Sequence, residues 1–127
     1  MSALANWHAM IEASDYSGLE SLIAEDAVFE SPVVHKPQVG KALTIKYLSS
    51  AMGLLNNGSF RYLGEWTAEG SAVLEFACEL DGIAVNGVDM IWWNAHQQIT
   101  RFKVMVRPLK AINMLHQKMG EMLARSL

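Results

Sequence analysis

The chain has 127 residues, of which 51 % are hydrophobic and 18 % are charged, so it carries enough apolar side chains for one folded core and is not a disordered chain. Thirteen acidic residues against ten basic ones give a net charge of −3, which excludes the basic surplus typical of nucleic-acid binding. A single cysteine, Cys78, excludes an intramolecular disulfide. Neither a signal-peptide pattern nor an apolar run of about 20 residues is present, so we expect a cytoplasmic protein with no membrane partner.

The first part of the chain has the apolar spacing of helices. Ser2 is placed to cap a helix that ends near Ser14, and Asp15 to cap a short second helix that reaches Ile23. A short strand is expected over residues 27–31, and an irregular extended loop follows between the prolines of segment 32–37.

A third helix should begin at Gly40 and end at Asn56-Asn57-Gly58. The apolar residues then alternate with period two, and Asp-Gly and Glu-Gly turns separate the alternating runs, which predicts a meander of antiparallel strands. The expected strands cover residues 59–69, 72–80, 83–94 and 98–107. Helical spacing returns after Pro108 and continues to the C-terminus.

This order of elements predicts one α+β domain over residues 1–127. We expect a curved antiparallel sheet wrapped around the N-terminal helices as a cone, with a C-terminal helix. The inside of such a cone is concave and largely apolar, which is the usual form of a ligand site.

Several segments resemble the SnoaL-like and ketosteroid-isomerase-like branch of the nuclear-transport-factor-two-like (NTF2-like) superfamily. They are Asp15-Tyr16-Ser17-Gly18-Leu19, residues 22–29, Glu30-Ser31-Pro32, Pro37, Gly40-Lys41 and Arg107-Pro108-Leu109. The resemblance covers essentially the whole chain and implies the conical fold. It specifies no activity, because this fold hosts isomerases, cyclases, epoxide hydrolases, dehydratases and binding proteins.

The ketosteroid-isomerase pattern can be carried over position by position. Its general-base aspartate falls on Ser31, its oxyanion-hole tyrosine on Trp7, and its protonated aspartic acid on Asp89. A serine hydroxyl is far too weak a base to abstract a carbon-bound proton. We therefore predict that this protein does not isomerise steroid-type enones.

Asp89 lies in the most apolar strand and shares a face with Val85, Ile91 and Trp93. If that face is concave, desolvation raises the pKa of the carboxyl group, which suits a general acid. The alternatives are a convex position or pairing with an arginine. His35, in the proline-bounded loop, is the second acid–base candidate, and a solvent-exposed loop histidine is its alternative.

The other histidines are interpreted as surface or partly buried residues: His8, His96 and His116. Their spacing is not that of a metal motif and no acidic cluster accompanies them, so we predict no metal and no cofactor. Arg101, Lys103 and Arg107 alternate with apolar residues on the last strand. The sequence leaves open whether this basic face lies inside the cone or outside it.

Ligand-binding side chains are predicted among the aromatic residues that could line the cone and at Ser31, the position of the base in the isomerase pattern. They are Trp7, Phe29, Ser31, Tyr47, Trp66, Phe76 and Trp93. Ordinary core packing is the alternative for at least half of the aromatic ones.

The leading hypothesis is therefore a protein that binds a small apolar molecule in a conical pocket. Its catalytic form is a cofactor-independent acid–base enzyme of isomerase, cyclase or lyase type, with Asp89 and His35 as the reacting groups. The alternative is a non-catalytic interaction or structural module that uses the convex face of the sheet. Because the helices cover only one face, we expect a two-fold homodimer through the other.

Overall fold

The helices and strands of the computed structural model, which describes residues 2–125, follow one another largely in the expected order. Helix α1 (Ala3–Ala13) is capped by the Ser2 hydroxyl, which accepts a hydrogen bond from the backbone of Ala5, and it ends at Ser14 in the left-handed conformation. Helix α2 (Leu19–Leu22) has only four residues. Asp15 does not cap it, because its carboxylate instead accepts a hydrogen bond from the backbone N–H of Ser17.

Strand β1 (Ile23–Glu30) begins earlier than expected, because Ile23 belongs to this strand and not to the second helix. A two-residue strand that the sequence did not predict, β2 (Gln38–Val39), pairs antiparallel with β1. Helix α3 (Lys41–Leu55) then starts after Gly40, whose φ of 106° is a conformation open mainly to glycine. The loop between β1 and β2 is irregular, as expected.

The remaining strands form the predicted meander, with ends within two residues of those expected. They are β3 (Arg61–Ala68), β4 (Ser71–Leu80), β5 (Ile83–Trp93) and β6 (Ile99–Arg107). The full sheet has the order β2-β1-β6-β5-β4-β3, and β1 pairs with β6 in parallel. The sheet is therefore mixed rather than wholly antiparallel, because a pairing between segments so far apart in sequence leaves no local signal.

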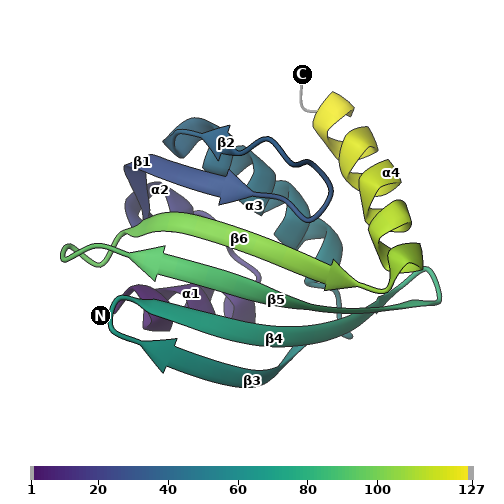
Figure 1. Ribbon diagram of the computed structural model, residues 1–127, viewed down its shortest axis with the longest axis horizontal. Coiled ribbons are helices and arrows are strands. Elements are labelled where there is room, and N and C mark those ends of the chain that lie inside the picture. The colour runs from purple at the N-terminus through teal and green to yellow at the C-terminus, as the bar shows by residue number, and fades with distance from the viewer. Residues whose placement is uncertain (1, 126–127) are drawn as a thin grey trace.

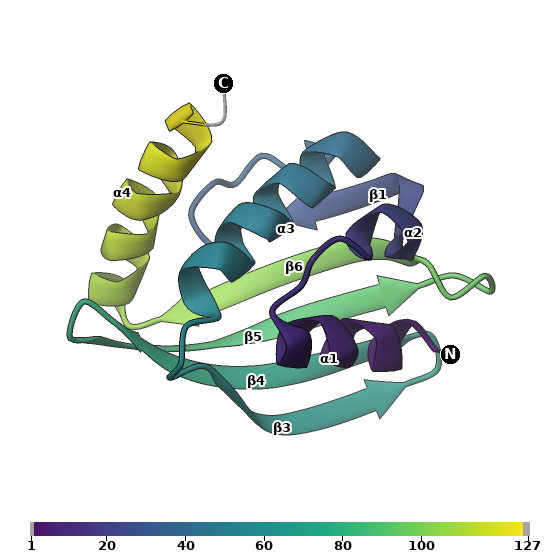
Figure 2. The ribbon, with the colours of Figure 1, turned by 180° about the vertical axis from the view of Figure 1, so that it is seen from behind.

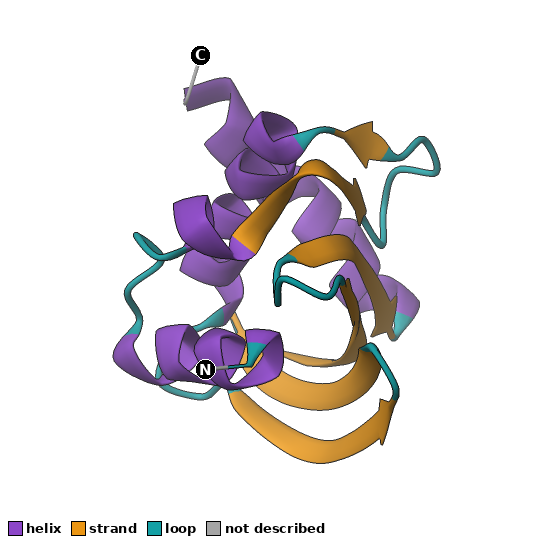
Figure 3. Ribbon diagram, turned by 90° about the vertical axis from the view of Figure 1, so that its left-hand side faces the viewer, coloured by secondary structure: helices purple, strands orange, loops and turns teal. Residues whose placement is uncertain are grey.

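The sheet curves around the helices (Figure 3), and α1 and α3 lie across its concave face (Figures 1 and 2). Helix α4 (Leu109–Arg125) stands at the end of the sheet where β6 leaves it. The core lies between the helices and the concave face, and its largest fully buried side chains are Trp7, Phe29, Phe76 and Phe102. In the part of the chain that the structure describes, no helix has the length and apolar character needed to cross a membrane.

The basic face of β6 lies outside the cone. Phe102 and Val104 point into the core, whereas Arg101 and Lys103 point outward and form ion pairs with Glu30 on β1. The guanidinium group of Arg101 also lies 4.5 Å from the ring centre of Trp92. The question that the sequence left open is therefore settled in favour of a solvent-facing basic surface.

Candidate functional site

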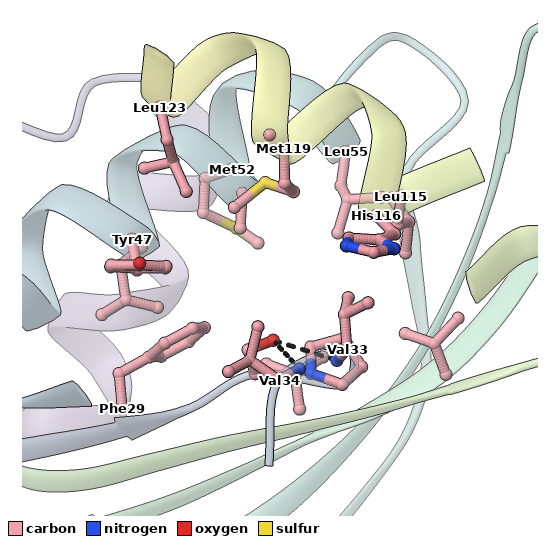
Figure 4. Close-up of a pocket in the computed structure, with 17 residues that line it drawn as sticks. Phe29, Val33, Val34, Tyr47, Met52, Leu55, Leu115, His116, Met119 and Leu123 are labelled. Atoms are coloured by element: carbon pink, nitrogen blue, oxygen red, sulfur yellow. Dashed lines mark hydrogen bonds between the residues drawn. The ribbon is translucent and has the colours of Figure 1, made fainter. Parts of the chain in front are cut away.

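A cavity of about 200 Å³ lies between α3 and α4, above the strands β1 and β6 (Figure 4). Most of its lining is aliphatic, aromatic or thioether. The lining residues are Phe29, Ser31, Pro32, Val33, Val34, Tyr47, Leu48, Ala51, Met52, Leu55, Val104, Val106, Leu115, His116, Met119, Gly120 and Leu123. Among these described residues the polar side chains are those of Ser31, Tyr47 and His116, and no carboxylate, ammonium or guanidinium group is present.

Local structure explains how the two sides of this cavity form. At the end of β1, the Ser31 hydroxyl oxygen accepts hydrogen bonds from the backbone N–H groups of Val33 (2.9 Å) and Val34 (3.1 Å), which folds the loop back along the cavity. On the opposite side, Leu115, Met119 and Leu123 follow one another at four-residue spacing and so face the cavity from one side of α4.

Two larger hollows, of about 430 and 390 Å³, run along α1 at the surface. Their walls mix apolar residues with exposed polar ones such as Asp15, Ser17 and Glu12. They lack the enclosure and the apolar lining of the cavity between α3 and α4, so they are surface grooves rather than ligand pockets.

A second group of interacting side chains, which we call the buried polar chain, consists of Trp7, Tyr62 and Asp89. The Tyr62 hydroxyl donates to Oδ2 of Asp89 (2.6 Å), and the Trp7 indole N–H donates to the Tyr62 oxygen (2.9 Å). Asp89 is fully buried, and its Oδ1 has no hydrogen-bond partner among the described residues. It lies on the concave side of the sheet, and its partner is a tyrosine rather than an arginine.

Desolvation raises the pKa of Asp89 to about 7, although the hydrogen bond from Tyr62 acts in the opposite direction. Burial also raises the pKa of the Tyr62 phenol well above its ordinary range. A carboxyl group that titrates near neutral pH can donate a proton or hold one, as the sequence-based interpretation of Asp89 requires.

The buried polar chain and the cavity are neighbours that do not open into one another. Asp89 on β5 stands directly opposite Val104 on β6, and Val104 is part of the cavity lining. Such opposite side chains have Cβ atoms about 4.5–5.5 Å apart. Asp89 is therefore the cross-strand neighbour of a residue in the cavity wall, without itself lining the cavity.

The structure brings together only part of the predicted ligand-binding set. Phe29, Ser31 and Tyr47 line the cavity. Trp7 and Phe76 do not line it, and both are fully buried elsewhere in the core. Trp93 also lies away from it and packs half-buried against the core near the end of β5.

The prediction that Trp66 binds the ligand is wrong, because its side chain does not line the cavity and is 60 % exposed. Alternation along β3 would place it on the same face as Tyr62, which points inward. A β-bulge between Tyr62 and Gly64 changes the alternation, and Trp66 then pairs with Val73 on the convex face.

The histidine at the cavity is not the one that the sequence singled out. His35 is exposed in the loop and does not line the cavity, whereas His116 on α4 does (Figure 4). His116 directly follows Leu115 in the apolar stripe of α4. This position next to the stripe is the one feature of the sequence that could have indicated a place at the cavity. His8 pairs with Glu65 at 2.7 Å and stacks edge-on against the Tyr62 ring. Within residues 2–125, no group of three His, Cys, Asp or Glu side chains could hold a metal ion.

Comparison with solved structures identifies close relatives of this chain. A steroid delta-isomerase from Pseudomonas aeruginosa is 35 % identical, with a TM-score of 0.92, and the match covers 98 % of this chain and 90 % of that one. An uncharacterised protein with a cystatin-like fold from Silicibacter pomeroyi is 27 % identical, with a TM-score of 0.85, and the match covers 94 % of this chain and 83 % of that one.

A more distant match shows the fold alone. The epoxide hydrolase/cyclase-like enzyme SalBIII, which acts in pyran ring formation in the polyether salinomycin, is 17 % identical with a TM-score of 0.67, and the match covers 84 % of this chain and 89 % of that one. No protein-family model matches the sequence, and no curated protein matches it significantly.

Proposed function

This chain belongs to the NTF2-like superfamily, in its SnoaL-like and ketosteroid-isomerase-like branch, and on this premise we propose that it binds a small, mostly apolar molecule between α3 and α4. The observation that carries the proposal is the cavity itself, which is lined from two helices, two strands and a loop and is almost wholly apolar. None of the chain's tryptophan side chains fills it. An open apolar cavity favours ligand binding over a purely structural role.

Acid–base chemistry on that molecule is the catalytic form of the proposal. It is supported by Asp89, whose Oδ1 is unpartnered among the described residues and whose strand position adjoins Val104 in the cavity wall. A reacting group would have to reach the carboxyl past the cavity wall. His116, an exposed residue that lines the cavity, replaces His35 as the imidazole available to a bound molecule.

The methionines provide a direct test of binding. Met52 and Met119 line the cavity, whereas Met105 lies on the convex face and is 48 % exposed. In protein with ¹³C-labelled methionine methyl groups, titration with toluene should shift the resonances of Met52 and Met119 and leave that of Met105 unchanged. Shifts at Met105 alone, or no shift up to the solubility limit of toluene, would contradict the proposal.

A cavity-filling variant and a matched control sharpen this test. Ala51 lines the cavity on α3, so Ala51→Phe should place a ring in the space and abolish the toluene shifts. Ala42 is exposed on the same helix, so Ala42→Phe carries the same substitution outside the cavity and should leave binding intact. Equal effects of the two variants would mean that toluene binds elsewhere.

We also propose that two copies of the chain associate through the convex face of the sheet. A row of cross-strand neighbours leads from Trp66 through Val73 to Met90, and the pair Val88 and Met105 lies beside it. Trp66 and Met105 are 60 % and 48 % exposed, so this apolar row is uncovered in the single chain.

Sedimentation at micromolar concentration tests the dimer. The unmodified protein should sediment as a dimer and Trp66→Glu as a monomer, because a carboxylate in place of the most exposed side chain of the apolar row would be desolvated on association. Leu43→Glu, on an exposed site of α3 behind the sheet, is the matched control and should remain dimeric. A monomeric mass for the unmodified protein would contradict the proposal.

A further inference from the structure

The size of the cavity limits what can enter it. An engineered apolar cavity of about 150 Å³ in another protein holds one benzene molecule. The cavity here, of about 200 Å³, is only moderately larger. It therefore has room for one six-membered ring with a short substituent and is too small to enclose a fused four-ring skeleton.

The chemistry of the wall disfavours a charged ligand. The described lining contains no lysine, arginine, aspartate or glutamate side chain. A bound ammonium group would lose its hydration without gaining an ion-pair partner, and a carboxylate or phosphate could pair only with a protonated His116, so a charged ligand is disfavoured. A neutral molecule meets no such cost.

The hydrogen bonds of Ser31 decide whether its hydroxyl can donate to a ligand or accept from one. A hydroxyl group has two acceptor positions and one donor proton. Both acceptor positions of Ser31 are occupied, because its oxygen accepts hydrogen bonds from the N–H groups of Val33 and Val34. What remains is the proton, for which the structure shows no acceptor within the described chain. Towards a molecule in the cavity, Ser31 is therefore a donor only, whereas Tyr47 and His116 each offer both a donor and an acceptor.

We propose that the ligand is an uncharged, single-ring-sized apolar molecule that presents an acceptor oxygen, such as that of a ketone or an ether, to the Ser31 hydroxyl. This inference rests on the proposed binding function and specifies its ligand class. Ser31 is in this view the residue that selects for the oxygen. It occupies the position at which the isomerase pattern has an aspartate base. An ionised aspartate accepts a proton or a hydrogen bond, whereas Ser31 would donate a hydrogen bond to the ligand.

The test compares two ligands of nearly equal shape, acetophenone and ethylbenzene, of which only acetophenone carries an acceptor oxygen. Their dissociation constants are measured from the Met52 and Met119 methyl shifts in the unmodified protein, in Ser31→Ala and in Ser31→Thr. The ratio of the two constants cancels effects common to both ligands, including any loosening of the loop when the bonds to Val33 and Val34 are lost. The Thr variant keeps the hydroxyl and serves as the conservative control.

We expect the preference for acetophenone relative to ethylbenzene to fall about three- to tenfold in Ser31→Ala, the range for one hydrogen bond, and to persist in Ser31→Thr. Benzoate should bind at least about tenfold more weakly than acetophenone. If both ligands bind and Ser31→Ala leaves their ratio unchanged, or if benzoate binds as tightly as acetophenone, the ligand class is wrong while the binding function stands. If neither neutral ligand shifts Met52 and Met119, both proposals are overturned.

Discussion

The cavity and the buried polar chain each have one of the two properties that an acid–base enzyme needs in a single place. The cavity has space for a molecule, but within the described residues its polar side chains are only Ser31, Tyr47 and His116. The buried polar chain has a carboxyl group with a pKa of about 7, but Asp89 is fully enclosed by protein. Val104, which lines the cavity, is the cross-strand neighbour of Asp89. In this member of the family, the cavity and the Asp89 carboxyl group are therefore adjacent but separate.

The hydrogen bond of Trp7 shows why the buried polar chain does not serve the cavity. Its indole is fully buried, and its only N–H is donated to the Tyr62 hydroxyl. The side chain at the position of the family's oxyanion-hole tyrosine therefore offers no free donor to a ligand. It fixes Tyr62 in place instead, and Tyr62 in turn holds Asp89.

The largest expected effect concerns enone isomerisation, which would require the two regions to act together. Without a positioned base the protein should lack the about 10²–10⁴-fold in rate that general-base catalysis supplies. A spectrophotometric assay with 3-cyclohexenone, a single-ring substrate, and with a steroid-type enone should show only the background rate. Ready turnover by the unmodified protein would contradict the account.

Ser31→Asp sharpens the same comparison. Activity that appears only in this variant would show that the scaffold is competent and that the missing carboxylate is decisive. We expect the gain to be partial, because the N–H groups of Val33 and Val34 would hydrogen-bond the new carboxylate and lower its basicity.

A second prediction concerns the pH dependence of stability at Asp89. Its pKa is about 7 in the folded protein and 3.8 in the reference state, so between these values the folded state holds a proton that the unfolded state has lost. The contribution of Asp89 to the free energy of unfolding is then greatest below pH 4 and falls as the pH rises to 7, by on the order of 4 kcal/mol. Asp89→Asn keeps an acceptor for Tyr62 and removes the ionisation.

Urea unfolding of the unmodified protein and of Asp89→Asn from pH 4 to pH 8 measures this difference. The stability of the Asn variant relative to the unmodified protein should rise through this window and level off above pH 7. Parallel pH profiles would show that Asp89 is ionised or solvated in the folded protein.

A third and smaller effect separates the two tyrosines. Tyr62→Phe leaves the Trp7 N–H and Oδ2 of Asp89 unpaired in the core, which should cost about 1–3 kcal/mol of unfolding free energy for each buried group left unsatisfied. The pKa of Asp89 should also rise further, so the loss should be greater at pH 8 than at pH 5. Tyr47→Phe, in the cavity wall, is the control and should change stability by less than about 0.5 kcal/mol. Equal losses in both variants would remove the distinction between the regions.

The sequence predicted best the features that depend on neighbouring residues. The meander of β3 to β6 follows from alternation and turn residues, and the cap of α1 from Ser2. Asp89 was placed on the core-facing side of its strand by the same alternation. The family resemblance predicted more of the fold than the residue pattern alone, because it related segments that are far apart in the chain.

Features that depend on long-range packing were missed. The parallel pairing of β1 with β6 and the position of α4 together decide where the cavity lies, and neither has a local signature. The bulge in β3 places Trp66 on the outer face, and the alternation of residues along β3 does not indicate this bulge. His116 is exposed, as expected, but its place in the cavity lining depends on how α4 packs against α3, which the sequence does not show.

The measurement that tests the central claim most directly is a crystal structure of the protein grown with acetophenone. We expect the ring between Met52 and Met119, over Val104, with the ketone oxygen within hydrogen-bond distance of the Ser31 hydroxyl and the buried polar chain unchanged. A molecule bound on the convex face, or in the grooves along α1 with the cavity empty, would contradict it.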